Sequence, residues 1–312
     1  MSTLWLEVTL PFEEEDGEAA EAAAQVLARW SQGRVVWSYE QPRVDATNRV
    51  RERGPVTVRA YIPVTPENLE STRRQVAEAL WHLHVIRPMP EPRFRVLQDE
   101  DWLQAWKRFY RPIRVGHRLL VLPAWMSSDD PERIPIFIEP GTAFGTGMHP
   151  STRLCLEALE TWVQPQRPLL DVGCGSGILA IAGAKLGARP AVGVDIEPEA
   201  IEEARKNAVR NQVGAVTSFL VGSVPEILAG KAPVRRAPVV VANIFADVLA
   251  DLLDQGLARL LTPDGVLILS GILEDTAHLV QQAAARQGLR LVRRTQEGEW
   301  VCLHYKIATS SS

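Results

Sequence analysis

Three glycines alternate in the segment Gly173-Cys-Gly-Ser-Gly177, which follows the apolar run "PLLDV" and precedes the helix-forming run "ILAIAGAK". A strand, a glycine turn and a helix in this order predict a nucleotide-binding turn, because a glycine backbone can approach a ligand closely. A dinucleotide fingerprint would require a third glycine at the position that Ile178 occupies. The spacing therefore argues against a nicotinamide dinucleotide.

Two carboxylates flank this turn and indicate a different ligand. Asp195 ends the run "AVGVD" about twenty residues further on, where a carboxylate can accept hydrogen bonds from both hydroxyls of a ribose. Ile196 beside it offers an apolar surface for an adenine ring. Asp171, just before the turn, would repel a pyrophosphate but suits a ligand that carries an ammonium and a sulfonium. Together these residues predict that the cofactor is S-adenosylmethionine.

A further polar residue, Asn243, ends the run "PVVVAN". We expect it at the carboxyl edge of a parallel sheet, where open α/β folds bind their ligands. Many methyltransferases that act on adenine or on glutamine amides have Asn-Pro-Pro-Tyr at this place, and the prolines and tyrosine clamp a planar nitrogen. This chain has Asn243-Ile-Phe-Ala246, which lacks the clamp and favours an aliphatic amine as the target.

The sequence identifies no catalytic acid or base. His149 lies in the loop "FGTGMHPST", but a lone loop histidine is more often structural, so we assign it no catalytic role. The other histidines have no metal-ligand spacing with acids or cysteines, and we predict no metal site.

Strand and helix patterns alternate over residues 131–312. Apolar strands separated by helices predict a mostly parallel sheet that is covered on both faces. Only "TQEG" or thereabouts separates the last two strands, which is too short for a crossover and predicts an antiparallel hairpin. We therefore expect a seven-stranded Rossmann-like sheet, and expect its helix after the "FGTGMHP" segment to be capped by Ser151 or Thr152.

The first part of the chain follows a different pattern. Residues 1–98 have the order βαββαβ, which is that of a small ferredoxin-like α+β domain. Residues 99–130 begin with the helical pattern "DEDWLQAWKRFYRP", so we interpret this span as a helical linker. The predicted organisation is a recognition domain over 1–98, the linker over 99–130 and a cofactor-binding domain over 131–312.

Composition limits the class of protein. A chain of 312 residues with 46% hydrophobic and 23% charged residues can form two packed domains. No apolar run is long enough for a membrane span, the N-terminus is acidic, and three cysteines lie far apart, so we expect a cytoplasmic protein. Residues 31–118 carry sixteen Lys/Arg against ten Asp/Glu. This excess is consistent with contact to RNA and equally with a solvated arginine-rich surface.

Several stretches of the chain resemble a known family. The stretches "EDWLQAWKRFYRPIRVG", "FGTGMHPSTRLCLEAL", the glycine turn, "GVDIEPEAIEEARKNAVRN" and "VANIFADVL" look like the successive signatures of the PrmA family, the methyltransferases of large-subunit ribosomal protein eleven. The resemblance extends from about residue 95 to the C-terminus and implies a class I methyltransferase domain. In that family the cofactor contacts match Thr152, Gly173, Asp195 and Asn243, and the loop around Phe144 and Gly145 closes over the cofactor. The glycine turn itself predicts Gly175 as a further cofactor contact. Ile196 is predicted as another because it lies beside Asp195.

The resemblance also implies an activity and a partner. Methyl groups would pass from S-adenosylmethionine to the N-terminal α-amine and lysine side chains of ribosomal protein eleven, free or bound to the ribosome. Residues 1–98 would recognise that substrate, RNA contact would be incidental, and the enzyme is expected to be a monomer with no membrane contact. The alternative is an S-adenosylmethionine-dependent RNA methyltransferase that uses the basic segment.

Overall fold

The computed structural model describes residues 4–13, 16–31, 35–39, 43–44, 50–51, 56–98, 112–139 and 149–308. The chain divides into two compact units, Met1–Arg111 and Pro112–Ser312. The helix expected after residue 99 and the loop that contains Phe144 and Gly145 lie outside the described residues.

The first unit is built on a four-stranded antiparallel sheet with the order β2-β5-β1-β6. Its main elements are β1 (Leu4–Phe12), α1 (Gly17–Ser31), β2 (Val35–Tyr39), β5 (Val56–Val64), α2 (Leu69–Ile86) and β6 (Arg93–Gln98), and the short strands β3 (Arg43–Val44) and β4 (Val50–Arg51) pair with each other. Alternate residues of β1, such as Leu6, Val8 and Leu10, are buried in one cluster with side chains of α1 and α2. This order of elements and strands is ferredoxin-like, as the sequence predicts.

The second unit contains a seven-stranded sheet with the order β12-β11-β10-β13-β14-β16-β15. The strands are β10 (Leu169–Val172), β11 (Ala191–Asp195), β12 (Thr217–Val221), β13 (Ala237–Asn243), β14 (Leu261–Leu273), β15 (Leu289–Glu297) and β16 (Trp300–Ile307). The first five pair in parallel, whereas β16 is antiparallel to both of its neighbours. The predicted Rossmann-like sheet with a C-terminal antiparallel hairpin is thus confirmed.

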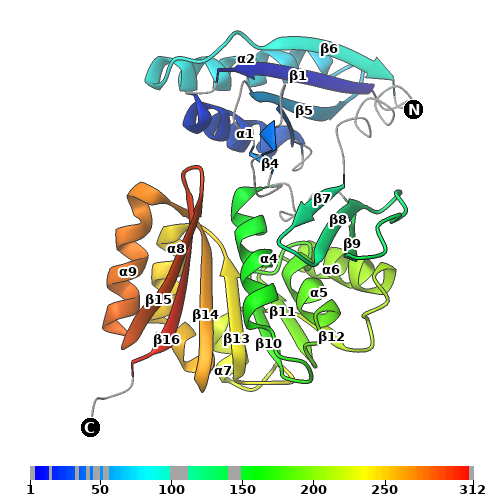
Figure 1. Cartoon of the computed structure of the whole chain (residues 1–312). Helices are drawn as coiled ribbons and strands as arrows, with labels where there is room; N and C mark the ends of the chain where they lie inside the picture. The colour runs from blue at the N-terminus through cyan, green and yellow to red at the C-terminus, as the bar shows by residue number, and fades with distance from the viewer. Residues whose placement is uncertain are drawn as a thin grey trace. The chain divides into compact units, whose positions relative to one another are not determined.

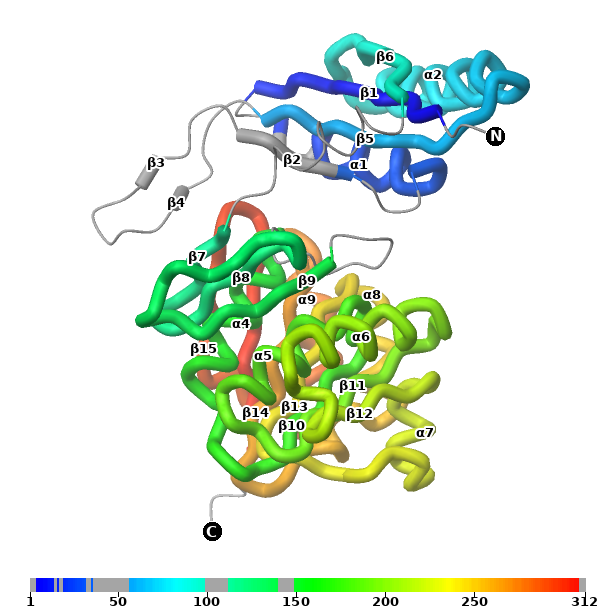
Figure 2. The backbone as a smooth tube through the Cα atoms, turned by 90° about the vertical axis from the view of Figure 1, so that its right-hand side faces the viewer, coloured from blue at the N-terminus to red at the C-terminus, as the bar shows by residue number. Residues whose placement is uncertain are grey.

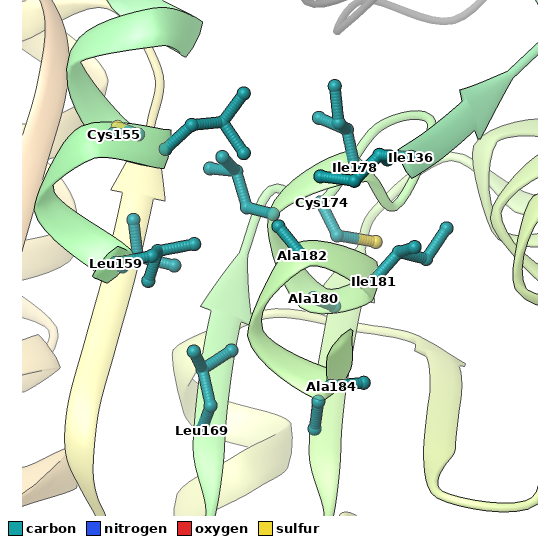
Figure 3. Packing of buried hydrophobic residues seen from close by; sticks show 14 of the residues in the cluster. Ile136, Cys155, Leu159, Leu169, Cys174, Ile178, Ala180, Ile181, Ala182 and Ala184 are labelled. Atoms are coloured by element: carbon teal, nitrogen blue, oxygen red, sulfur yellow. The ribbon is translucent and has the colours of Figure 1, made fainter. Parts of the chain in front are cut away.

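Helices cover both faces of this sheet (Figures 1 and 2). One layer consists of α4 (Pro150–Trp162), α5 (Ile178–Lys185) and α6 (Pro198–Arg210), and the other of α7 (Val224–Leu228), α8 (Ala246–Asp254) and α9 (Ala277–Arg286), with the short helices η1 (Leu257–Leu260) and η2 (Glu274–Thr276). Successive residues of a strand pack against opposite helix layers, because side chains alternate between the two faces of a sheet. Leu169 packs with α4 and α5, as Figure 3 shows, whereas Leu170 packs with the layer of α8 and α9.

A three-stranded sheet corrects the helical-linker prediction. It consists of β7 (Ile113–Val115), β8 (Leu119–Pro123) and β9 (Ile134–Ile138), and it lies beside α4 and α5 (Figure 2). The span 99–130 is therefore not helical throughout: Gly116, at φ +52°, forms the turn between β7 and β8, and every residue of the apolar run "LLVLP" is buried. Glu160 of α4 fixes this turn by accepting the N–H groups of His117, Arg118 and Leu119 at 2.8–3.0 Å.

None of the helices in the described part of the chain is both long enough and apolar enough to cross a membrane.

Candidate active site

The predicted site residues that the structure describes come together at one edge of the seven-stranded sheet. Strands β10, β11 and β13 run parallel, so Val172, Asp195 and Asn243 end at the same edge. The glycine turn follows Val172 and leads into α5. Thr152, in the first turn of α4, reaches this edge from outside the sheet through a hydrogen bond to Asn243.

Glycine is required in the turn for two reasons. Gly173, Gly175 and Gly177 have φ of +72°, +50° and +79°, a backbone conformation that other residues rarely adopt. There is also no room for side chains: a Cβ on Gly173 would collide with the side chain of Ile244, and a Cβ on Gly177 would lie 2.9 Å from that of Ala204. The turn is therefore packed between the corner after β13 and helix α6.

Asp195 is fixed by backbone groups on both of its oxygens. Oδ2 accepts the N–H of Gly175 at 2.8 Å, and Oδ1 accepts the N–H of Glu197 at 3.1 Å. A carboxylate has about four acceptor positions, so each oxygen can accept one more donor. Ile196, next in the chain, exposes 69% of its surface. This arrangement can bind two hydroxyl groups beside an apolar surface.

Asn243 contributes an acceptor that the described residues do not use. Its Nδ2 donates to Thr152 Oγ1 at 3.2 Å, whereas its buried Oδ1 has no hydrogen-bond partner within the described part of the chain. Leaving a buried acceptor unpaired costs about 1–3 kcal/mol, which a ligand with an N–H or O–H donor would recover. The corner is held by the N–H of Ile244, which donates to Ser270 O at 3.0 Å.

The start of α4 differs from the prediction. His149 is the N-cap, not Ser151 or Thr152: the helix begins at Pro150, and His149 Nδ1 accepts the N–H of Ser151 at 3.3 Å. The same ring nitrogen lies 2.7 Å from Ser151 Oγ, and the ring packs edge-on against Trp300 with centroids 4.4 Å apart. These contacts support a structural role for His149.

Asp171 lies beneath the turn. It is 1% exposed, and its Oδ2 accepts the N–H of Ala180 at 3.0 Å. Burial raises the pKa of Asp171 to about 7, the Ala180 hydrogen bond opposes this rise, and the nearby charge of Asp195 adds to it. The carboxyl group thus fastens the start of α5, and a nearby cation would favour its charged form.

Two features of the site were not predicted from the sequence. Arg153, 8% exposed, forms a two-pronged ion pair with Glu297, which ties α4 to the β15–β16 hairpin with a shortest N–O distance of 2.7 Å. Asn207 of α6 and Asn211, the C-cap of this helix, bind backbone groups at the end of β9 and in the glycine turn. A visible signal was Asn207 itself, because asparagine is disfavoured inside a helix.

Within the described ranges, no group of three or more His, Cys, Asp or Glu side chains could hold a metal ion. The cysteines Cys155, Cys174 and Cys302 are free thiols, and all three are buried.

Comparison with known proteins identifies the family. The sequence model of the family described as "Ribosomal protein L11 methyltransferase (PrmA)" matches residues 4–308, nearly the whole chain. The chain belongs to this family. A PrmA-family protein of Chloroflexus aurantiacus, named "Ribosomal protein L11 methyltransferase", is 39% identical over 98% of both chains. The protein of that name from Pelotomaculum thermopropionicum is 41% identical over 79% of this chain and 78% of its own.

A solved structure agrees with this membership. The ribosomal protein L11 methylase from Lactobacillus delbrueckii subsp. bulgaricus is 30% identical, and it superposes with a TM-score of 0.57 over 64% of this chain and 99% of its own. As a member of the PrmA family, the protein is a methyltransferase with a Rossmann-like domain, a class that uses S-adenosylmethionine. The left-handed glycine turn, the anchored carboxylate of Asp195 and the unused Oδ1 of Asn243 fit a nucleoside with an amino-acid tail.

Proposed function

We propose that this protein transfers methyl groups from S-adenosylmethionine to amines of ribosomal protein L11, namely its N-terminal α-amine and its lysine side chains. The observation that carries the proposal is that the glycine turn, Asp195 and the Thr152–Asn243 pair meet at one sheet edge in a PrmA-family chain. Bound there, the cofactor supplies an electrophilic methyl group on a sulfonium.

Each site residue has a distinct part in holding the cofactor. Asp195 binds the two ribose hydroxyls with the lone pairs that Gly175 and Glu197 leave free, and Ile196 lies against the adenine. The amino-acid tail of the cofactor lies against the backbone at Gly173 and Gly175. Asn243 Oδ1 accepts an N–H donor of that tail while its Nδ2 remains on Thr152 Oγ1. Phe144 and Gly145, which lie outside the described residues, are proposed to contact the cofactor by resemblance to the family.

The chain accelerates the reaction mainly by orientation. Holding two reactants in line can lower a barrier by roughly 7–11 kcal/mol, so no strong base is required at the site. His149 Nδ1 is occupied by the α4 cap, and we assign no catalytic base. The amine must then reach the site neutral, which is easier for an α-amine (pKa about 7.7–8.0) than for a lysine (about 10.4).

The proposed substrate is recognised outside the cofactor domain. We assign this role to residues 1–98, treat RNA contact by the basic segment 31–118 as incidental, and propose that the enzyme acts as a monomer. The alternative, RNA methylation, is favoured by the excess of Lys/Arg over Asp/Glu in that segment. The corner Asn243-Ile-Phe-Ala246, which lacks a clamp for a planar base, opposes it.

One incubation separates the two activities. The protein is mixed with S-adenosylmethionine labelled in the methyl group and with either undermethylated ribosomal proteins or bare ribosomal RNA. We expect label in the band of L11 and none in the RNA. Label in the RNA alone would establish the alternative, and label in neither substrate would contradict both.

A further inference from the structure

Helix α6 buries Asn207, and the residue that caps its C-terminus, Asn211, is buried on the same side. Asn207 and Asn211 are 0% and 3% exposed, and residues four apart in a helix lie on the same side. Asparagine is unfavourable in a helix interior, because its side chain competes for backbone hydrogen bonds. Asn207 therefore requires partners outside the helix, and Asn211, at the helix end, binds both Asn207 O at 2.9 Å and groups outside the helix.

The first partner is the free edge of strand β9, continued by Glu139, the residue that follows the strand. Asn211 Oδ1 accepts the N–H of Phe137 at 2.9 Å while Asn211 Nδ2 donates to the carbonyl of the same residue, and Asn207 Oδ1 accepts the N–H of Glu139 at 3.2 Å. The spacing matches: four helix residues rise about 6 Å, and two strand residues about 6.6 Å. The two amides thus take the place of a neighbouring strand at the edge of the sheet β7-β8-β9.

Asn207 also binds the glycine turn, whereas the second partner of Asn211 Nδ2 is the carbonyl of Asn207 itself, at 2.9 Å. Asn207 Nδ2 donates to the carbonyl of Ser176, inside the glycine turn, at 3.0 Å. The orientation of the amide is unambiguous, because one partner is a backbone N–H and the other a backbone carbonyl. The close contact of Gly177 with Ala204, one turn earlier on α6, brings the helix near enough for this bond.

An ion pair accompanies the two amides but does not replace them. Arg210 Nη2 lies 2.9 Å from Glu139 Oε2, with side chains 37% and 47% exposed. Exposed ion pairs contribute little to stability. When a buried amide is removed, by contrast, its hydrogen-bond partner stays buried without a partner, and the protein loses the full desolvation free energy of that group. The position of the turn relative to β9 therefore depends on Asn207.

We propose that Asn207 is a positioning residue for cofactor binding. It holds the carbonyl of Ser176 and so fixes the turn in which the N–H of Gly175, one residue earlier, points at Asp195, whereas Asn211 only fastens β9 to the end of α6. The proposal rests on the proposed function, because it takes the Gly173–Gly177 turn to hold the cofactor.

The two asparagines provide a matched test. Asn207→Ala and Asn211→Ala each remove a buried amide that binds the backbone at the end of β9 (Phe137 or Glu139), so both should lower the melting temperature of the free protein by similar amounts. Only Asn207→Ala should also weaken binding of S-adenosylhomocysteine in a calorimetric titration, by about tenfold. Lys206→Ala, on the exposed face of the same helix, serves as a control that should change neither quantity.

Asn207→Asp keeps the test valid should Asn207→Ala fail to fold. The aspartate retains the acceptor for Glu139 but, when ionised, cannot donate to Ser176, so we expect it to bind S-adenosylhomocysteine more weakly than the parent. Equal affinities of the Asn207 and Asn211 variants would overturn the positioning role. If the parent protein itself fails to bind the cofactor, the proposed function is wrong and this inference falls with it.

Discussion

Asp195 has two backbone donors and room for two more, so its loss should affect the ligand more than the fold. Hydrogen bonds to a charged group contribute roughly 1.5–3 kcal/mol, so Asp195→Ala should weaken S-adenosylmethionine binding by about 10- to 150-fold. Calorimetric titration of the folded variant measures this affinity directly. Asp195→Asn keeps one acceptor oxygen, so its affinity should lie between those of the parent and of Asp195→Ala. Undiminished affinity in a folded Asp195→Ala protein would rule out the assignment.

Asp171 should make stability depend on pH. Its pKa rises on folding from 3.8 to about 7, mainly through burial, so between these values the folded state holds a proton that the unfolded chain releases. The resulting stabilisation is fully present below pH 3.8 and is lost as pH rises toward 7. It amounts at most to on the order of 4 kcal/mol.

Asp171→Asn should therefore flatten this dependence. We expect the difference in unfolding free energy between the parent and the variant, measured with urea at each pH, to decline from pH 4 to pH 7. A constant offset between the two proteins is expected and irrelevant, because only the slope reports the titration. Parallel profiles over this range would show that Asp171 does not titrate there.

Single residues also show where sequence reasoning succeeds. The places of the turn glycines and of Asp195 could be predicted because they follow from local spacing after a strand. The bonds of Asn207 could not, since its partners Glu139 and Ser176 lie 68 and 31 residues away. His149 was not recognised as the cap because a histidine rarely serves in that position, where Ser, Thr, Asp and Asn are preferred.

At the level of elements, strands bounded by glycine and proline were predicted well and the β7–β8 hairpin was not. The run "LLVLP" is short and apolar, and such a run cannot be told from a buried helix segment by periodicity alone. The structure of this run is decided by the turn between β7 and β8, which Glu160 of α4 fixes. The carboxylate of Glu160 binds N–H groups that lie more than forty residues away in the chain, so no local pattern reveals them.

Glu160→Ala should therefore destabilise the second unit. The variant loses three hydrogen bonds to a charged acceptor, and even one such bond contributes roughly 1.5–3 kcal/mol. Chemical denaturation of the full chain should show at least that loss in unfolding free energy. Glu160→Gln, which retains one acceptor oxygen, should be less affected, and equal stability of all three proteins would contradict the role of Glu160.

At the scale of the whole molecule, the two compact units divide the proposed work. If the first unit recognises ribosomal protein L11, a fragment comprising residues 112–312 should still bind S-adenosylmethionine but lose methyl transfer to that substrate. The parent and the fragment are compared by calorimetric titration and by transfer of labelled methyl groups. Full transfer by the fragment would mean that the first unit has another task.

Intact-mass spectrometry of ribosomal protein L11 shows whether the enzyme transfers methyl groups to amines of this substrate. The full chain is incubated with S-adenosylmethionine and either unmodified L11 or L11 whose amines have been acetylated beforehand. We expect unmodified L11 to gain mass in whole methyl steps and the acetylated protein to gain none. Equal gains in both substrates, or no gain in the unmodified one, would contradict the proposed transfer to amines.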